Sequence, residues 1–297
     1  MQEFSPNKKP KMKSPELIKS ELFRTAMKCG FDGFGVCSAD DFSGAERARL
    51  DAWLESGMCA EMGYLRRGAD TKLSPRKFMP NAISAICLAA NFFRKSPETR
   101  IALYAQGPDY HHVLRNRIRE VEDIIAANGG EYRTSIDASP LWEKAIAARA
   151  GIGCIGKNTL IIRKFNGPWS FLCVILCNLK LPTDAPAQDI CGNCDICIKA
   201  CPSRAISSAG IDARKCISYL TIEKKSALSE EETKLSQNKI FGCDACLRAC
   251  PYGKDAPEAA IEEFRGTIQL PQNPSRDDLL NAARGTPMWR RFGKREF

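Results

Sequence analysis

Features that would place the chain at a membrane are missing from its 297 residues. Residues 1–14 are polar and basic and lack the apolar stretch that a secretory signal peptide needs. The longest apolar run, residues 169–179, is too short to span a bilayer and is typical of a buried strand. We therefore expect a cytoplasmic protein that makes no membrane contact.

Nucleotide-binding motifs and solenoid-length repeats are also missing. The glycine-rich segment at 151–156 fits neither the Walker pattern nor the GxGxxG pattern, which argues against a P-loop or dinucleotide site. Its glycines allow a tight backbone path and close approach of a ligand, and Lys157 and Asn158 add a cation and an amide. The residues alone predict an anionic or amide-rich ligand near this turn.

Positively charged residues outnumber negatively charged ones. The chain has 44 Lys and Arg against 35 Asp and Glu, which gives a formal net charge of +9. Such an excess is typical of proteins that bind an anionic partner such as nucleic acid. A solvated basic surface with no partner is the alternative, and charge alone does not separate the two.

The periodicity predicts an α+β fold. Ser14 is the expected N-cap of a helix from Pro15 to Cys29, with Gly30 ending it. Further helices are expected at 45–56, 112–128 and 145–150, and strands at 31–37, 82–93, 131–136 and 169–179. A polar, proline-containing linker at 182–189 suggests three parts: a domain over 1–185, a cysteine-rich module over 186–255, and a polar basic tail over 256–297.

Cysteine is abundant, with fifteen residues, and eight of them lie between residues 191 and 250. In a long chain without an export signal this clustering favours metal over disulfides. The first run has the x2, x2, x3 spacing followed by proline that is typical of [4Fe–4S] ligands. It consists of Cys191, Cys194, Cys197 and Cys201, followed by Pro202.

A second run lacks one cysteine of this pattern. It contains Cys243, Cys246 and Cys250, followed by Pro251, and the isolated Cys216 can supply the missing ligand. We therefore predict a ferredoxin-like module with two [4Fe–4S] clusters. Cluster 1 is assigned to Cys191, Cys194, Cys197 and Cys250, and cluster 2 to Cys201, Cys216, Cys243 and Cys246. Zinc knuckles are the alternative. The other seven cysteines (29, 37, 59, 87, 154, 173 and 177) are expected to be small buried hydrophobic residues.

Four features in this order resemble the epoxyqueuosine reductase family over residues 15–255. They are Tyr104-Ala-x-Gly-x-Asp-Tyr-His111, Asp137-x-x-Pro140, Arg149-Ala-Gly-x-Gly-x-x-Gly-Lys-Asn158, and the cysteine order with Cys216 in the gap. The resemblance implies a cobalamin-dependent enzyme with two clusters, related in architecture to reductive dehalogenases. Its first domain would be an α/β-type, nitroreductase-like domain that binds cobalamin.

The implied reaction reduces epoxyqueuosine to queuosine in tRNA, the last step of queuosine biosynthesis. An external electron donor of flavodoxin or ferredoxin type and a monomeric enzyme are expected. The resemblance makes Asp137 the catalytic acid, although a turn or cap aspartate before Pro140 is the alternative. It also suggests cobalamin contacts and substrate contacts. Gly156, Lys157, Asn158, Thr159 and Lys144 are the candidates for cobalamin; Tyr104, Tyr110 and His111 line the substrate pocket or cap the following helix.

A departure from the family pattern leaves the substrate open. Many relatives continue into a C-terminal helical-repeat domain that helps to grip tRNA, whereas this sequence ends at Phe297. Basic residues at 8–13 and 290–295 are expected to replace part of that grip through phosphate contacts. Reduction of a small molecule, as in reductive dehalogenases, and a cluster-only electron carrier are the alternatives.

Overall fold

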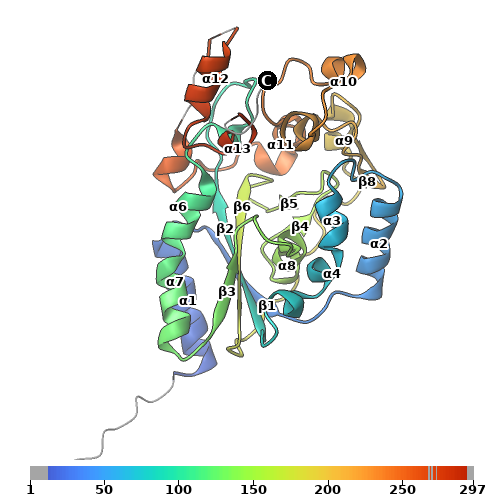
Figure 1. The fold of residues 1–297 in the computed structure, drawn as a ribbon. Coiled ribbons are helices and arrows are strands. Elements are labelled where there is room, and N and C mark those ends of the chain that lie inside the picture. Colours follow the sequence, from blue (N-terminus) through green and yellow to red (C-terminus); the bar gives the residue numbers. More distant parts are fainter. Residues whose placement is uncertain (1–12, 267, 269, 272, 293–297) are drawn as a thin grey trace, which may run out of the picture.

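The computed structural model describes residues 13–266, 268, 270–271 and 273–292. At its centre lies an antiparallel four-stranded sheet in the order β1-β2-β6-β3 (Figure 1). The strands are β1 (Gly33–Ser38), β2 (Ser84–Asn91), β3 (Tyr132–Ser135) and β6 (Ser170–Cys177). Strand β2 is buried along its whole length, as its continuous apolar sequence predicts for a central strand covered on both faces.

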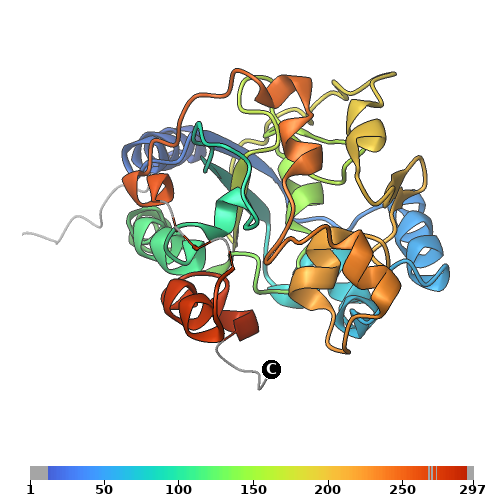
Figure 2. The same cartoon turned by 90° about the horizontal axis from the view of Figure 1, so that it is seen from above.

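Helices cover both faces of the sheet, as the view from above shows (Figure 2). One face is covered by α1 (Pro15–Lys28), α6 (Tyr110–Arg117) and α7 (Arg119–Ala127). The other is covered by α8 (Glu143–Arg149), with α2 (Gly44–Glu55), α3 (Gly63–Arg67), α4 (Ala69–Leu73) and α5 (Pro75–Phe78) beyond it.

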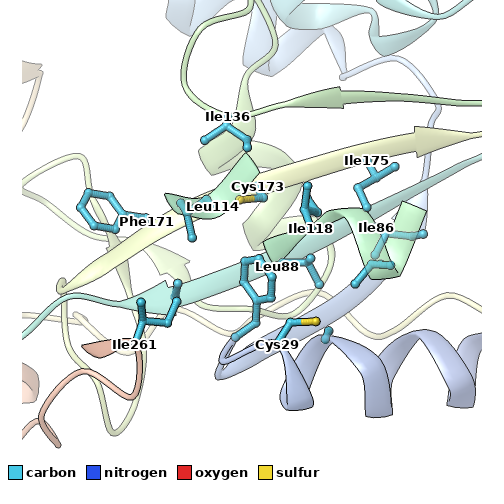
Figure 3. Packing of buried hydrophobic residues seen from close by; sticks show 14 of the residues in the cluster. Cys29, Ile86, Leu88, Leu114, Ile118, Ile136, Phe171, Cys173, Ile175 and Ile261 are labelled. Atoms are coloured by element: carbon cyan, nitrogen blue, oxygen red, sulfur yellow. The ribbon is translucent and has the colours of Figure 1, made fainter. Parts of the chain in front are cut away.

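The alternation of side chains along β2 and β6 produces the two cores. Ile86, Leu88 and Ile175 point toward α6 and pack with Leu114 and Ile118 (Figure 3). The intervening residues of both strands, among them Cys87 and Val174, join the core that includes α8. Because successive side chains of a strand point to opposite faces, one apolar run serves both layers.

The predicted elements are largely confirmed. Ser14 caps α1 by accepting a hydrogen bond from the Leu17 backbone N–H at 3.3 Å. The single helix expected over 112–128 is wrong, because the chain forms α6 and α7 with Ile118 at their junction. Helices α3, α4 and α5 and the short pair β4 (Cys154–Ile155) and β5 (Ile161–Ile162) were not predicted.

Beyond β6 the chain forms a layer of short elements at the upper end of the sheet (Figure 1). They are α9 (Ile196–Ala200), β7 (Ile206–Ser207), β8 (Gly210–Ile211), the π-helix η2 (Tyr219–Glu223), α10 (Glu230–Leu235), α11 (Ala245–Arg248) and the 3-10 turn η3 (Pro251–Gly253). Helices α9 and α11, which follow the first cysteines of each run, pack against each other.

The segment expected to be a polar tail returns to the body of the protein. Ile261 and Phe264, the latter in the 3-10 helix η4 (Glu262–Arg265), join the main core. Helices α12 (Arg276–Ala283) and α13 (Trp289–Phe292) follow, and Met288 and Phe292 pack with Phe241. The basic residues Lys8, Lys9, Lys11, Lys294 and Arg295 lie outside the described residues.

In the part of the chain that the structure describes, none of the helices combines the length and apolar character needed to cross a bilayer.

Candidate functional site

Two groups of four cysteines come together at the upper end of the sheet. Cys191, Cys194, Cys197 and Cys250 line one small cavity, although 53 residues of sequence separate the last two. The second group consists of Cys201, Cys216, Cys243 and Cys246. These residues are identified as neighbours because the charges of the other thiols act on the pKa of Cys246. Burial raises the pKa of Cys246, and the neighbouring thiols of Cys243, Cys216, Cys201 and, least, Cys197 raise it further. The structure thus brings the eight predicted cluster cysteines close together, and their division between two clusters stays a prediction.

Backbone N–H groups point at several of these sulfurs. The Ala205 N–H donates to Cys201 Sγ at 3.2 Å, and the N–H groups of Tyr252 and Gly253 act on Cys250. Burial raises the pKa of Cys191 to about 11, and the Lys157 N–H opposes that shift. Hydrogen bonds to sulfur stabilise a thiolate, the form that binds iron, so this donor set fits a cluster.

All fifteen cysteines, every one of them in the described residues, are free thiols. The seven outside the two quartets are buried, as predicted. Cys173 and Cys29, for example, lie in the core beside α6 (Figure 3). Cys154 differs from these, because its Sγ lies within 4.8 Å of Cys191 Sγ.

The loop that follows β3 presents Asp137. The Asp137 backbone has φ of 54°, a left-handed conformation that is uncommon for a residue other than glycine. Its N–H donates to Glu143 Oε1 at 2.9 Å, and the hydroxyl of Ser135 donates to the same oxygen. Asp137 is an exposed residue, and its carboxylate accepts a part-buried hydrogen bond from the Tyr110 hydroxyl at 2.5 Å. Several hydrogen bonds thus hold the loop in a backbone conformation that is unfavourable for aspartate, which is typical of functional sites.

Aromatic side chains support Tyr110 from behind. Its ring stacks on Phe171 with a centroid distance of 4.2 Å and on His111 with 4.1 Å, and Tyr104 packs edge-on at 6.2 Å. His111 Nδ1 lies 2.6 Å from Asp109 Oδ1, while its Nε2 is buried without a hydrogen-bond partner. A buried nitrogen that has no hydrogen-bond partner in the protein is available to a bound group.

Tyr110 and His111 also belong to the start of α6. Asp109 is the N-cap of that helix and accepts from the His111 N–H at 3.0 Å. The two interpretations left open by the sequence are therefore compatible. Both residues occupy the first turn of the helix, and one of them bonds Asp137.

The glycine-rich turn lies between the Asp137 loop and the cysteines. Lys144 Nζ donates to the Thr159 carbonyl at 2.9 Å, and Thr159 has φ of 63°. Lys157 and Asn158 instead line the cavity of the first cysteine quartet. Asn158 is buried, and its Nδ2 donates to the Cys246 carbonyl at 3.5 Å. The turn therefore contacts both cysteine groups.

Three further titratable residues adjoin Asp137 and received no role from the sequence. Burial raises the pKa of Glu143 to about 7, and the Asp137 charge adds to the shift. Burial lowers the pKa of Lys72 and of Lys144, against the opposing charges of Asp137 and Glu143. Partial burial, with Glu223 and Asp137, raises the pKa of Tyr64 to about 12. Glu143 lay in the predicted segment and could have been found there; Tyr64 and Lys72 carried no sequence signal.

Electrostatics also link this group to the second cysteine quartet. Among the charges that act on Lys144 are Asp137, Glu143 and Cys246. Lys144 is therefore close enough to feel the charges of both the exposed Asp137 and the half-buried Cys246.

Comparisons with known proteins identify the family of the chain. Residues 190–253 match the family model for a 4Fe-4S double cluster binding domain, and residues 72–138 match the one for epoxyqueuosine reductase QueG, DUF1730. The chain is 37% identical over 250 residues to the epoxyqueuosine reductase of Leadbetterella byssophila, which covers 82% of each chain. The chain belongs to the epoxyqueuosine reductase family. It is also 34% identical over 260 residues to the Vibrio cholerae member, covering 83% of this chain and 70% of the relative.

Solved structures of the family superpose on the whole described architecture. A crystal structure of epoxyqueuosine reductase with an epoxyqueuosine-modified tRNA-Tyr stem loop gives a TM-score of 0.79 at 27% identity, covering 94% of this chain and 76% of that one. The Bacillus subtilis enzyme, with its catalytic aspartate loop swung out of the active site, gives 0.79 at 27% identity, covering 93% and 78%. A reductive dehalogenase gives 0.50 at 18% identity, covering 87% and 34%, which shows a shared fold only. The expected family and its architectural relation to reductive dehalogenases are confirmed.

Proposed function

We propose that this protein reduces epoxyqueuosine to queuosine in tRNA, the last step of queuosine biosynthesis, with Asp137 as the proton donor. The observation that carries the proposal is the placement of Asp137, between Tyr110 and Glu143 and near Lys144, on which Cys246 also acts. Membership of the epoxyqueuosine reductase family supplies the substrate. The solved relative that holds a modified tRNA stem loop supports tRNA as the partner.

The two cysteine quartets hold the two [4Fe–4S] clusters. The match to a double cluster binding domain and the N–H groups directed at Cys201 and Cys250 support this assignment. Cluster 1 takes Cys191, Cys194, Cys197 and Cys250, and cluster 2 takes Cys201, Cys216, Cys243 and Cys246. Because Cys246 acts electrostatically on Lys144, cluster 2 is the one nearer to Asp137.

Cobalamin is the second cofactor of the proposal. Lys144 and the turn from Gly156 to Thr159 would hold it, with the backbone of the turn as the main contact because the Asn158 side chain is used internally. The unpartnered, buried His111 Nε2 near this site fits a pocket that is completed by a bound group. When bound, cobalamin supplies a low-valent cobalt that stores electrons delivered one at a time.

The residues of the chain manage the protons. Removing the epoxide oxygen as water breaks two C–O bonds, forms a C=C bond, and consumes two electrons and two protons. In its protonated form Asp137 gives one proton to the departing oxygen, while the Tyr110 hydroxyl fixes the other carboxyl oxygen. The second proton comes from solvent water, which reaches this exposed loop. Glu143 holds the backbone of the acid in place, and Lys144 and Lys72 offset the negative charge that remains after proton transfer.

The organisation of the chain completes the proposal. Residues 1–185 would form a nitroreductase-like catalytic domain, residues 186–255 the ferredoxin-like module, and residues 256–297 a C-terminal segment. Tyr104, Tyr110 and His111 would line the substrate pocket, supported by their mutual packing.

An external donor of flavodoxin or ferredoxin type would reduce the clusters of a monomeric enzyme. Cluster 1, whose ligands Cys191, Cys194 and Cys197 are only half-buried, is suited to receive those electrons.

Incubation with tRNA that contains epoxyqueuosine, followed by nucleoside analysis, tests the proposal. The reconstituted wild-type protein should form queuosine, and Asp137→Ala should lower the rate by about 10²–10⁴-fold. Iron content and the corrin absorption should be unchanged in that variant, because Asp137 is exposed and belongs to neither quartet. Asp123→Ala, on helix α7, removes a carboxylate elsewhere and should turn over normally. Wild-type turnover by Asp137→Ala would remove that residue from the mechanism.

A further inference from the structure

Cys154 is the one cysteine outside the two quartets whose sulfur meets a sulfur of cluster 1. Its Sγ, the Cys191 Sγ and a carboxylate oxygen of Asp189 all lie within 4.8 Å of one another. Cys154 packs in the same small apolar group as Cys250 and Ile162. It thus contacts two residues of cluster 1 without being needed to complete four ligands.

The backbone around Cys154 is held firmly. The residue is 6% exposed and lies in β4, opposite Ile162 of β5. A side chain on the preceding Gly153 would come within 2.6 Å of the Ile162 carbonyl, so the strands approach closely. The thiol is therefore fixed next to Cys191 rather than placed there by a mobile loop.

The separation of the sulfurs decides what Cys154 can do. A metal–thiolate bond is about 2.3 Å long, so two sulfurs within 4.8 Å can reach the same metal ion. Ligands of different corners of a cubane are held farther apart than that by the cluster between them. Cys154 and Cys191 are consequently alternatives for a single iron.

We propose that Cys154 is a reserve ligand of cluster 1, able to bind the iron that Cys191 otherwise holds. The exchange involves no change of oxidation state. The Cys154 thiol loses its proton as its sulfur binds iron, and the departing Cys191 thiolate takes up a proton. The inference rests on the proposed assignment of cluster 1 to Cys191, Cys194, Cys197 and Cys250.

Iron and sulfide counts of anaerobically reconstituted variants test this inference without an activity assay. Cys191→Ala should keep about eight iron atoms per chain, and Cys191→Ala/Cys154→Ala should lose at least one iron, falling toward about four. Cys194→Ala is the matched control, because Cys154 is placed beside Cys191 and not beside that sulfur; it should lose iron whether or not Cys154 is present. Cys154→Ala alone should keep all eight, which also shows that the change does not prevent folding.

The electron paramagnetic resonance spectrum of the reduced protein adds a second readout. Cluster 1 in Cys191→Ala should give a four-iron signal with altered g values, while the cluster 2 signal stays as in the wild type and shows that the chain is folded. Equal iron loss in Cys191→Ala and Cys194→Ala would overturn the inference. So would a double variant that keeps the iron of Cys191→Ala, because Asp189 or water would then be the ligand. Full iron content in Cys194→Ala would instead contradict the cluster assignment itself.

Discussion

Glu143 shows how a single side chain can organise the proton donor. One of its oxygens accepts the N–H of Asp137 and the hydroxyl of Ser135, which also bonds Ser139. These contacts connect both ends of the loop that carries the acid. Burial and the adjacent Asp137 make its ionisation costly, so its pKa is raised from 4.5 to about 7. The residue therefore changes charge near neutral pH while it holds the loop.

This shift makes the stability of the protein depend on pH in a defined direction. The unfolded chain releases the Glu143 proton near pH 4.5, whereas the folded protein keeps it up to about pH 7. Stability is therefore lost as pH rises across that interval, by roughly 2–3 kcal/mol, and the loss levels off above it. Glu143→Gln keeps an oxygen acceptor and cannot ionise, so this component should vanish.

Thermal unfolding of anaerobic samples between about pH 5.5 and 8 measures the difference. The midpoint of Glu143→Gln minus that of the wild type should increase with pH up to about 7. Glu120→Gln, on the exposed surface of α7, is the control for loss of one negative charge and should follow the wild type. A constant difference between Glu143→Gln and the wild type would contradict the raised pKa.

Individual residues could be predicted where the sequence itself carries their signal, and not where only tertiary packing brings them to the site. Cys216 stands alone in the sequence, yet the count of ligands required it, and the structure places it beside Cys201 and Cys246. Tyr64 and Lys72 come from helices far from Asp137 in sequence and meet it only through tertiary packing. No local pattern distinguishes such residues from ordinary surface tyrosine and lysine.

At the scale of elements, two glycines determine how the cysteine module meets the sheet. Gly167, in the turn before β6, and Gly253, in η3 just after Cys250, approach so closely that a side chain on Gly167 would come within 2.3 Å of Gly253 Cα. The Trp169 indole N–H donates to the Gly253 carbonyl at 3.3 Å. The position of Cys250 is therefore set by the start of β6.

Gly253→Ala should disturb this contact. The added Cβ would lie 2.7 Å from the Trp169 indole nitrogen and 2.9 Å from Pro168, and Trp169 is fully buried. We expect destabilisation of about 1–3 kcal/mol and weaker retention of cluster 1, since Cys250 precedes the turn. Gly44→Ala is the matched control, because a Cβ there meets nothing within 4 Å. Thermal unfolding and the rate of iron loss to a chelator measure both effects; equal behaviour of the two variants would contradict a tight junction.

Elements were predictable where a local signal sets both ends. Helix α1 has a serine cap at its start and Gly30 after its end, so its bounds were predicted within one residue. The break at Ile118 was missed because its buried side chain keeps the apolar periodicity of a continuous helix. The β4–β5 pair is two residues long on each side, and it depends on a close approach of Gly153 to Ile162 that periodicity cannot reveal.

For the whole molecule, the distribution of charge bears on how an anionic partner is held. The net charge of +9 includes Lys8, Lys9, Lys11, Lys294 and Arg295, which lie outside the described residues. Arg291, from the same expected basic end, donates to the Lys224 carbonyl within the protein. Cations near the Asp137 loop are therefore the described residues on which we test phosphate contacts.

Lys225 is the exposed cation best placed for that role. It lies two residues after Glu223, which adjoins Tyr64 beside Asp137, and its backbone is fixed by Glu61. If the substrate is tRNA, binding should weaken with salt, and Lys225→Ala should weaken it further and reduce the slope of log K against log salt by about one. Lys28→Ala, on the helix-covered opposite face of the sheet, should leave the slope unchanged. Filter binding of epoxyqueuosine-containing tRNA at several salt concentrations measures both slopes. Affinity that does not change with salt would favour a small-molecule substrate, because only a polyanion releases condensed counterions when it binds.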